Sequence, residues 1–162
     1  MFNTILVAVD GSDCATAATT LAIRLAKEDG ANLLLVNIVD VSKLIAVAGY
    51  ETPYPVDALD VLRESGEEEL TAAKSACEVA GLRVSVTTGQ GDACDEILRI
   101  AAENQVGLIC MGTHGRKGLS HLFIGSVAEG ILRRATVPVL VTRLPKGSAK
   151  TPASKKGDVA TC

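Results

Sequence analysis

The chain has 162 residues, 48% of them apolar and only four aromatic, which predicts one domain with an aliphatic core. Its net charge is −3, and because residues 1–145 carry −6 without a basic stripe, nucleic acid is not expected as a partner. No leader peptide follows Met1 and the apolar runs are shorter than the ~20 residues of a membrane helix, so we expect a soluble, cytoplasmic protein without a membrane partner.

Five short runs of apolar, often β-branched residues predict β-strands. Four of them are almost continuously apolar, as in strands that are covered on both faces. The third differs, because Leu82, Val84 and Val86 alternate with polar residues, as in a half-exposed strand. The predicted strands span residues 4–9, 33–39, 82–87, 106–111 and 137–141.

Segments with helical spacing lie between these runs. Ser12 is a possible N-cap of the first segment, and Gly30 follows its last residue as a stop signal. Gly81 ends the second segment in the same way. The predicted helices span residues 12–29, 57–80, 92–104 and 126–135.

This alternation predicts an α/β fold, an open parallel five-stranded sheet with helices on both faces. The alternating third strand belongs at an edge, and so does the fifth, because Pro138 cannot donate a hydrogen bond to a neighbouring strand. We therefore predict the strand order 3-2-1-4-5. The order 2-1-3-4-5 does not fit, since it would bury the third strand.

Two stretches carry no strand or helix pattern. Residues 40–56 form a long connection with two prolines, either a mobile surface loop or a lid. Residues 146–162 carry a net charge of +3 and few bulky apolar side chains, so we expect a disordered basic tail after a domain of residues 1–145. The five cysteines include no CxxC pair, which indicates reduced thiols rather than a disulfide framework.

The predicted strand order sets a position for a ligand. Open α/β sheets bind ligands at the carboxyl ends of the strands where the winding of the chain changes direction, here strands one and four. Asp10, Gly11 and Ser12 follow the first strand, and Met111 and Gly112 end the fourth. We therefore expect the site between these two chain segments.

A glycine-rich segment follows the fourth strand. Glycine lets a ligand approach main-chain N–H groups closely, and Arg116 and Lys117 add positive charge. Ser126 and Glu129 match the S-x-x-E capping box, and a helix beginning there would offer N–H donors to an anion. One interpretation is a phosphate-binding loop, and the other is a flexible loop before an ordinary helix cap. The glycines are Gly112, Gly115, Gly118 and Gly125.

Asp10 also has two interpretations. An acidic residue after a strand often caps the next turn or helix, and Ser12 lies in the same corner. Its carboxylate would alternatively accept hydrogen bonds from ribose hydroxyls, as an acidic residue does in dinucleotide sites. A carboxylate opposite a phosphate-binding loop indicates a nucleotide site more specifically than either feature alone.

Other motifs give weaker signals. No GxxxxGK[ST] phosphate loop is present, and Gly89–Cys94 is better interpreted as an acidic helix cap, since its aspartates would repel phosphate. His114 and His121 are too few for a metal site, and no side-chain metal site is predicted. A phosphoacceptor aspartate is not expected, because the third strand ends at Thr87 and Thr88 without a carboxylate. No catalytic residue is identified from spacing.

The chain resembles the universal stress protein family over residues 1 to 144. The resemblance is carried by Ile5–Ser12 (ILVAVDGS), by Gly112–Arg133 and by Val137–Arg143 (VPVLVTR). Gly112, Gly115 and Gly125-Ser126 match the G-x2-G-x9-G-[ST] pattern of the ATP-binding branch.

This resemblance implies a Rossmann-like sheet of the adenine nucleotide alpha-hydrolase type, with order 3-2-1-4-5, and ATP as the ligand, together with Mg²⁺ or Mn²⁺. Asp10 would lie near the ribose and Ile38 or Val39 near adenine, whereas Ala8 stands where some members have proline. The implied ATP-binding residues are Ala8, Asp10, Ile38, Val39, Met111, Gly112, Gly115, Arg116, Gly125, Ser126 and Val127.

Family members typically dimerise through the last strand, which implies a homodimer interface that includes Val137, Val139 and Val141. The expected function is that of an ATP-binding stress-response regulator with an unknown regulatory protein partner. A slow ATPase or self-phosphorylating enzyme, with Ser126 or a loop residue as acceptor, is the first alternative. An interaction module that never binds nucleotide is the second.

Overall fold

Strands alternate with helices along the residues that the computed structural model describes, 1–40, 56–113 and 124–143. The strands are β1 (Thr4–Ala8), β2 (Asn32–Val39), β3 (Val84–Gln90), β4 (Leu108–Gly112) and β5 (Val139–Thr142). The helices are α1 (Asp13–Asp29), α3 (Val56–Val79), α4 (Ala93–Glu103) and α5 (Ser126–Arg134). The predictions for the connection 40–56 and for the tail 146–162 concern residues 41–55 and 146–162, which lie outside the described part.

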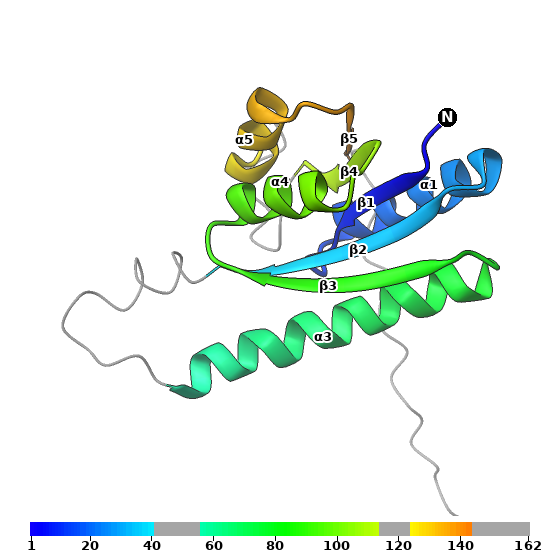
Figure 1. The fold of residues 1–162 in the computed structure, drawn as a ribbon. Helices are drawn as coiled ribbons and strands as arrows, with labels where there is room; N and C mark the ends of the chain where they lie inside the picture. The colour runs from blue at the N-terminus through cyan, green and yellow to red at the C-terminus, as the bar shows by residue number, and fades with distance from the viewer. Residues whose placement is uncertain (41–55, 114–123, 144–162) are drawn as a thin grey trace, which may run out of the picture.

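The strands form one parallel sheet in the order β3-β2-β1-β4-β5, which confirms the predicted order (Figure 1). β1 pairs with β2 on one side and with β4 on the other, so the chain winds outward in both directions from β1. The two strands predicted to be edge strands, β3 and β5, are the outermost strands of the sheet. Pro138 directly precedes β5, and its carbonyl accepts a hydrogen bond from the Ile109 N–H at 3.0 Å.

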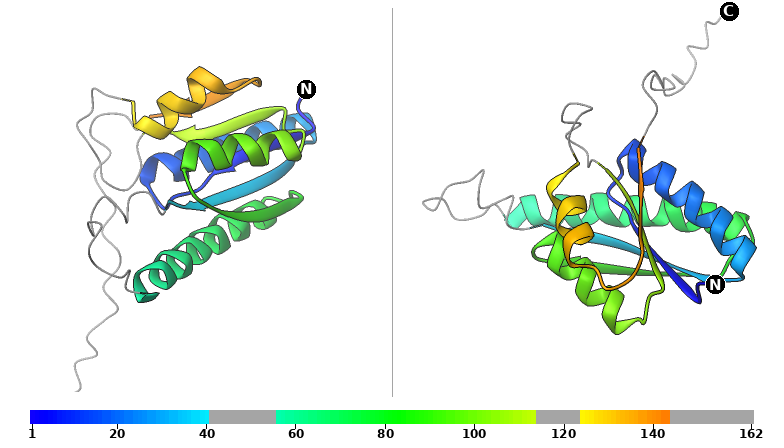
Figure 2. Two further views of the ribbon diagram at one scale, coloured as in Figure 1. Left: turned by 60° about the vertical axis from the view of Figure 1, so that its left-hand side comes forward. Right: turned by 90° about the horizontal axis from the view of Figure 1, so that it is seen from above.

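Two layers of helices cover the sheet (Figure 2). α1 and α3 pack on one face and α4 and α5 on the other, and each face has its own core cluster. The buried hydrophobic side chains of the described residues are aliphatic or contain sulfur, as the composition predicts. Within this part of the chain, no helix has both the length and the apolar character needed to cross a membrane.

The predicted helix ends are largely confirmed. Ser12 is the N-cap of α1 and accepts a hydrogen bond from the Ala15 N–H at 3.1 Å, and Gly30 ends the helix with a φ of 68°. Asp92 caps α4 by accepting from the Asp95 N–H at 3.0 Å, so the segment after β3 is a helix cap, as predicted.

The third strand differs from its prediction. It continues to Gln90 instead of ending at Thr88, because β2 continues to Val39 and pairs with it along the whole length. Val86 is 43% exposed rather than buried, since an edge strand has a neighbouring strand on one side only. The predicted alternation therefore holds for Leu82 and Val84 and fails at Val86.

Candidate functional site

The carboxyl ends of β1 and β4 lie side by side in the middle of the sheet. Val7 is opposite Cys110 in the register, which places Asp10 and Thr113, a few residues further on, at the same edge of the sheet. β2 follows on one side and β5 on the other, so the winding of the chain changes direction here. The structure therefore brings together the two segments that were predicted to form a site.

The first of these segments, the β4–α5 corner (Gly112, Thr113 and Gly125-Ser126), is joined by main-chain hydrogen bonds. The Gly125 N–H donates to the Thr113 carbonyl at 2.7 Å, and the Thr113 N–H donates to the Thr142 carbonyl at 2.9 Å. The two ends of the glycine-rich segment therefore meet beside the end of β4. Gly115 and Arg116 lie between these ends, outside the described residues.

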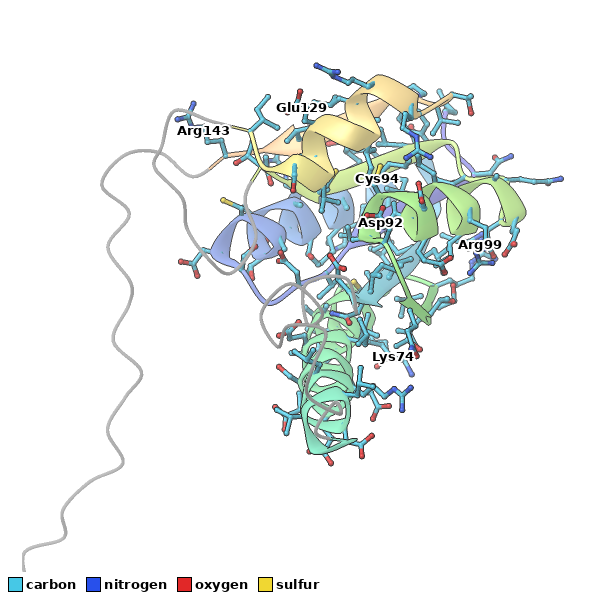
Figure 3. The ribbon with its side chains drawn as sticks, turned by 90° about the vertical axis from the view of Figure 1, so that its left-hand side faces the viewer. Lys74, Asp92, Cys94, Arg99, Glu129 and Arg143 are labelled. Carbon is cyan, nitrogen blue, oxygen red and sulfur yellow. The ribbon has the colours of Figure 1, made fainter. Side chains whose placement is uncertain are left out.

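Thr142 fastens this corner to the first turn of α1. Its hydroxyl donates to the Cys14 carbonyl at 2.8 Å, while its own carbonyl accepts from Thr113. Arg143 follows directly and is exposed, and Figure 3 shows it extending away from the sheet. This residue places a positive charge at the edge of the sheet that carries the candidate site.

The start of α5 corrects one prediction. Gly125 is the N-cap, with φ −64° and ψ 152°, and Ser126 is already the first helical residue, without a side-chain capping bond. The predicted capping box of Ser126 and Glu129 is therefore wrong, because the hydrogen bond from Gly125 to Thr113 fixes the extended residue one position earlier. Glu129 instead forms an ion pair with Arg133 at 2.9 Å, on the side of α5 away from the sheet (Figure 3). The Ser126 side chain is exposed and Val127 is half-buried.

Gly112 has a packing role that spacing did not predict. A Cβ atom at this position would lie 2.7 Å from the Cys14 Cβ and 2.9 Å from the Ala15 nitrogen. The Ala15 nitrogen and the Cys14 carbonyl carbon, which would also lie 2.9 Å away, are main-chain atoms and cannot move aside as the end of a flexible side chain can. Gly112 is therefore required for the close approach of β4 to α1, whether or not a ligand also contacts it.

The second segment, the β1–α1 corner (Val9, Asp10, Gly11 and Ser12), is held by side chains. The Asp10 Oδ1 accepts hydrogen bonds from the Ser12 N–H at 3.0 Å and from the Ser12 hydroxyl at 2.6 Å. The capping interpretation of Asp10 is thus realised in the structure. These two bonds fix the orientation of the Asp10 carboxylate relative to the start of α1.

Two residues that contact this corner were not singled out from the sequence. Asn37 on β2 donates to the Val9 carbonyl at 2.8 Å, and Glu69 on α3 lies against Gly11. A signal for Asn37 was present, because it is the lone polar residue within the apolar run at 33–39. Glu69 gave no signal of its own among the neighbouring glutamates of the same helix.

The remaining candidate residues lie at the ends of β1, β2 and β4. Ala8 and Ile38 are half-buried and keep part of their surface exposed, whereas Val39 and Met111 are buried. The Ile38 side chain lies over Gly89, where a Cβ would come within 2.6 Å of its Cδ1. Of the two residues expected near adenine, Ile38 therefore has exposed apolar surface that a ligand could contact, whereas Val39 does not.

The cysteines of the described residues are free, and three of the four are buried. Burial, with a further contribution from Glu78, raises the pKa of the Cys77 thiol to about 11, and burial raises the pKa of Cys110 to about 12. Burial also raises the pKa of Cys94, which lies between α4 and α5 next to Arg134, although the positive charge of Arg134 lowers it in part (Figure 3). These three thiols are therefore protonated core side chains, and no group of three potential metal-binding side chains occurs in the described part of the chain.

Comparison with known proteins agrees with this geometry. The sequence profile of the Universal stress protein family matches residues 1–143. A universal stress protein of Methanocaldococcus jannaschii is 34% identical over 146 residues, which cover 90% of this chain and 85% of the relative. The crystal structure of a protein from the same family from Burkholderia pseudomallei is 33% identical with a TM-score of 0.69, over 86% of this chain and 94% of that one.

A further solved structure is similar in fold. The universal stress protein from Archaeoglobus fulgidus, in complex with dAMP, is 23% identical with a TM-score of 0.65, over 86% of this chain and 97% of that one. At this identity the likeness concerns the arrangement of strands and helices. The bound nucleotide is a property of the Archaeoglobus protein.

Proposed function

Because this chain belongs to the universal stress protein family, we propose that it binds ATP, with Mg²⁺ or Mn²⁺, and regulates a stress response through its nucleotide-dependent conformation. The ligand would lie across the carboxyl ends of β1 and β4. Its phosphates would contact the β4–α5 corner and its ribose the β1–α1 corner. The binding of dAMP by a protein of the same fold supports an adenine nucleotide as the ligand class.

One observation carries this proposal: the hydrogen bond from the Gly125 N–H to the Thr113 carbonyl, 2.7 Å long. It brings the N-terminus of α5 to the end of β4. The first N–H groups of a helix have no partner within the helix, and its positive end favours an anion. Ser126 is exposed and the N-cap Gly125 makes no side-chain capping bond, so these donors would be directed toward a phosphate group bound at this corner.

The surroundings of the corner fit the other parts of the nucleotide. Asp10 would accept hydrogen bonds from the ribose hydroxyls, as its position beside the β4–α5 corner permits. The exposed parts of Ala8 and Ile38 would contact the adenine ring. Arg143 and Arg116 would add positive charge near the phosphates.

We further propose that the protein acts in the cytoplasm as a homodimer that pairs through β5. β5 is the terminal strand of the sheet, and an unpaired strand edge is normally covered by a partner or otherwise protected. Val137, Val139 and Val141 are only partly buried within the chain, which leaves apolar surface for an interface. An unidentified regulatory protein would then recognise the nucleotide-bound dimer.

The test is isothermal titration calorimetry of the purified chain with MgATP, beside a Gly125→Val variant. The backbone angles of Gly125 are allowed for valine, so the fold should survive while the added side chain blocks the phosphates. We expect micromolar binding by the wild type and no measurable binding by the variant. Ala102→Val, an exposed position at the far end of α4, is the control and should bind as the wild type does.

Equal ATP affinity of the wild type and Gly125→Val would contradict the proposal. The same samples, assayed for ADP release and for phosphate incorporated into the protein, separate a nucleotide-binding regulator from a slow ATPase or self-phosphorylating enzyme. Turnover that disappears in Ser126→Ala would favour the enzyme.

A further inference from the structure

A buried amide lies directly beneath the β1–α1 corner. Asn37 is 5% exposed, and its Nδ2 donates to the Val9 carbonyl at 2.8 Å and to the Glu69 Oε2 at 3.3 Å. Both hydrogens of this amide group are therefore used, as a buried polar group requires. The Val9 carbonyl belongs to the residue before Asp10, so Asn37 fixes the main chain at the start of the corner.

The carboxylate of Glu69 contacts the same corner from α3. A Cβ atom on Gly11 would lie 2.6 Å from the Glu69 Cδ and even closer to its Oε1, so the carboxylate occupies the space that a side chain at Gly11 would fill. Ser65, one helical turn earlier, donates to the Glu69 Oε1 at 3.4 Å. Gly11 has a φ of 73°, so both its conformation and the position of Glu69 favour glycine here.

Gly66 explains how α3 comes close enough to make these contacts. It is buried in the interior of α3, and a Cβ atom there would lie 2.4 Å from the Asn37 Oδ1 and 2.9 Å from its Cγ. Glycine stabilises a helix interior less than alanine does. At this position, however, any larger residue would collide with the Asn37 side chain. β2 and α3 thus converge on one short stretch of main chain.

We propose that Asn37 and Glu69 are positioning residues for Asp10, and that they hold its carboxylate where the ribose hydroxyls of the nucleotide require it. This inference rests on the proposed ATP binding. The Ser12 bonds orient the carboxylate relative to the corner, and the Asn37–Glu69 pair fixes the corner relative to the sheet. A displacement of about 1 Å is sufficient to lose a directional contact.

The test compares two ligands, ATP and 2′,3′-dideoxy-ATP, and takes the ratio of their dissociation constants. A general loss of structure weakens both ligands, whereas a misplaced Asp10 weakens only the ligand with ribose hydroxyls. The variants are Glu69→Ala, Glu69→Gln and Asn37→Asp. The reference for complete loss is Asp10→Ala, and the matched control is Glu68→Ala, which removes a neighbouring exposed carboxylate of the same helix.

We expect the preference for ATP to fall by roughly tenfold in Glu69→Ala and Asn37→Asp, toward the value of Asp10→Ala, with the dideoxy-ATP affinity unchanged. Glu69→Gln keeps an acceptor for the Asn37 amide and should restore most of the preference. Glu68→Ala should behave as the wild type. A preference that is unchanged in Glu69→Ala, or equal losses for both ligands, would overturn the inference.

A second measurement needs no nucleotide and separates this inference from the proposed function. The Ser12 N–H and the Asp95 N–H each donate to an aspartate Oδ1 at 3.0 Å, one in the β1–α1 corner and one at the start of α4. In Glu69→Ala, amide hydrogen exchange should become faster at Ser12 and remain unchanged at Asp95. If the wild type binds neither ligand, the proposed function fails, and the exchange rates alone decide whether Asn37 and Glu69 hold the corner. Equal exchange at Ser12 in the wild type and in Glu69→Ala would then refute the positioning role.

Discussion

The two corners of the candidate site lie side by side at one edge of the sheet but are stabilised by different interactions. The β1–α1 corner depends on side chains, with Asn37 and Glu69 beneath it and the Asp10–Ser12 hydrogen bonds within it. The β4–α5 corner depends on the main chain, through the bonds that join Thr113 to Gly125 and to Thr142. Removing side-chain atoms should therefore disturb the β1–α1 corner. Adding a side chain at a glycine should disturb the β4–α5 corner.

The largest effect is expected where the β4–α5 corner gains an atom. In Gly112→Ala the new Cβ would press on Cys14 and on the Ala15 main chain, and we expect a loss of about 1–3 kcal/mol in the free energy of unfolding, measured in urea. In the control Gly107→Ala the Cβ would lie 3.3 Å from the Phe2 ring, which can turn aside, so a smaller loss is expected. An equal loss of unfolding free energy in the two variants would mean that β4 and α1 can move apart without destabilising the protein.

The next effect concerns a deletion at the β1–α1 corner. Ser12→Ala removes the side-chain cap of α1 and the hydrogen bond from the Ser12 hydroxyl to Asp10, and should cost about 1–2 kcal/mol of stability. Asp92→Ala removes an equivalent cap at the start of α4, outside both corners, and should cost about 1 kcal/mol. Calorimetry should show weaker ATP binding in Ser12→Ala only. Weaker binding in both variants would show that the distinction between the corner and an ordinary helix cap is wrong.

The smallest effect is a pH dependence of stability that arises from Glu96 on α4, outside both corners. Hydrogen bonds from Arg99 lower the pKa of the Glu96 carboxyl below its ordinary value. A carboxyl whose pKa is lower in the folded state stabilises the protein above its unfolded-state pKa, and this contribution is lost as the pH falls through the folded-state value. Glu96→Gln should therefore be slightly less stable than the wild type at pH 7, and the difference should disappear as the Glu96 carboxyl becomes protonated at acidic pH.

Thermal unfolding across this pH range, followed by circular dichroism, measures the difference. ATP affinity at pH 7 should be the same in Glu96→Gln and in the wild type, since α4 contributes no residue to either corner. A stability difference that grows as the pH falls would contradict the assignment of the lowered pKa to Arg99.

The strand order was predictable because each edge strand carries a local signal. The alternation at Leu82 and Val84 marks β3, and Pro138 marks β5. The N-cap of α1 was predictable for the same reason, since Ser12 acts on a donor three residues away.

The errors arose where a distant contact decides the local structure. The spacing of Ser126 and Glu129 matches a capping box, but a hydrogen bond from Gly125 to Thr113 moves the helix start by one residue. The packing role of Gly112 was missed for the same reason, because the Cys14 side chain that it contacts belongs to a helix nearly 100 positions earlier in the chain. Distant contacts do sometimes leave a signal in the sequence. Asn37, a lone polar residue within an apolar strand, indicates a buried hydrogen bond to another part of the chain.

The attachment of Thr142 to Thr113 and to Cys14 bears on how the protein should be handled in the laboratory. All five strands run parallel, so Arg143 lies at the same edge of the sheet as the candidate site, whereas Met1 lies near the opposite edge (Figure 2). Affinity tags and fluorescent fusions are therefore better placed ahead of Met1. A truncation that removes Thr142 would also remove the hydrogen bond that joins β5 to the first turn of α1.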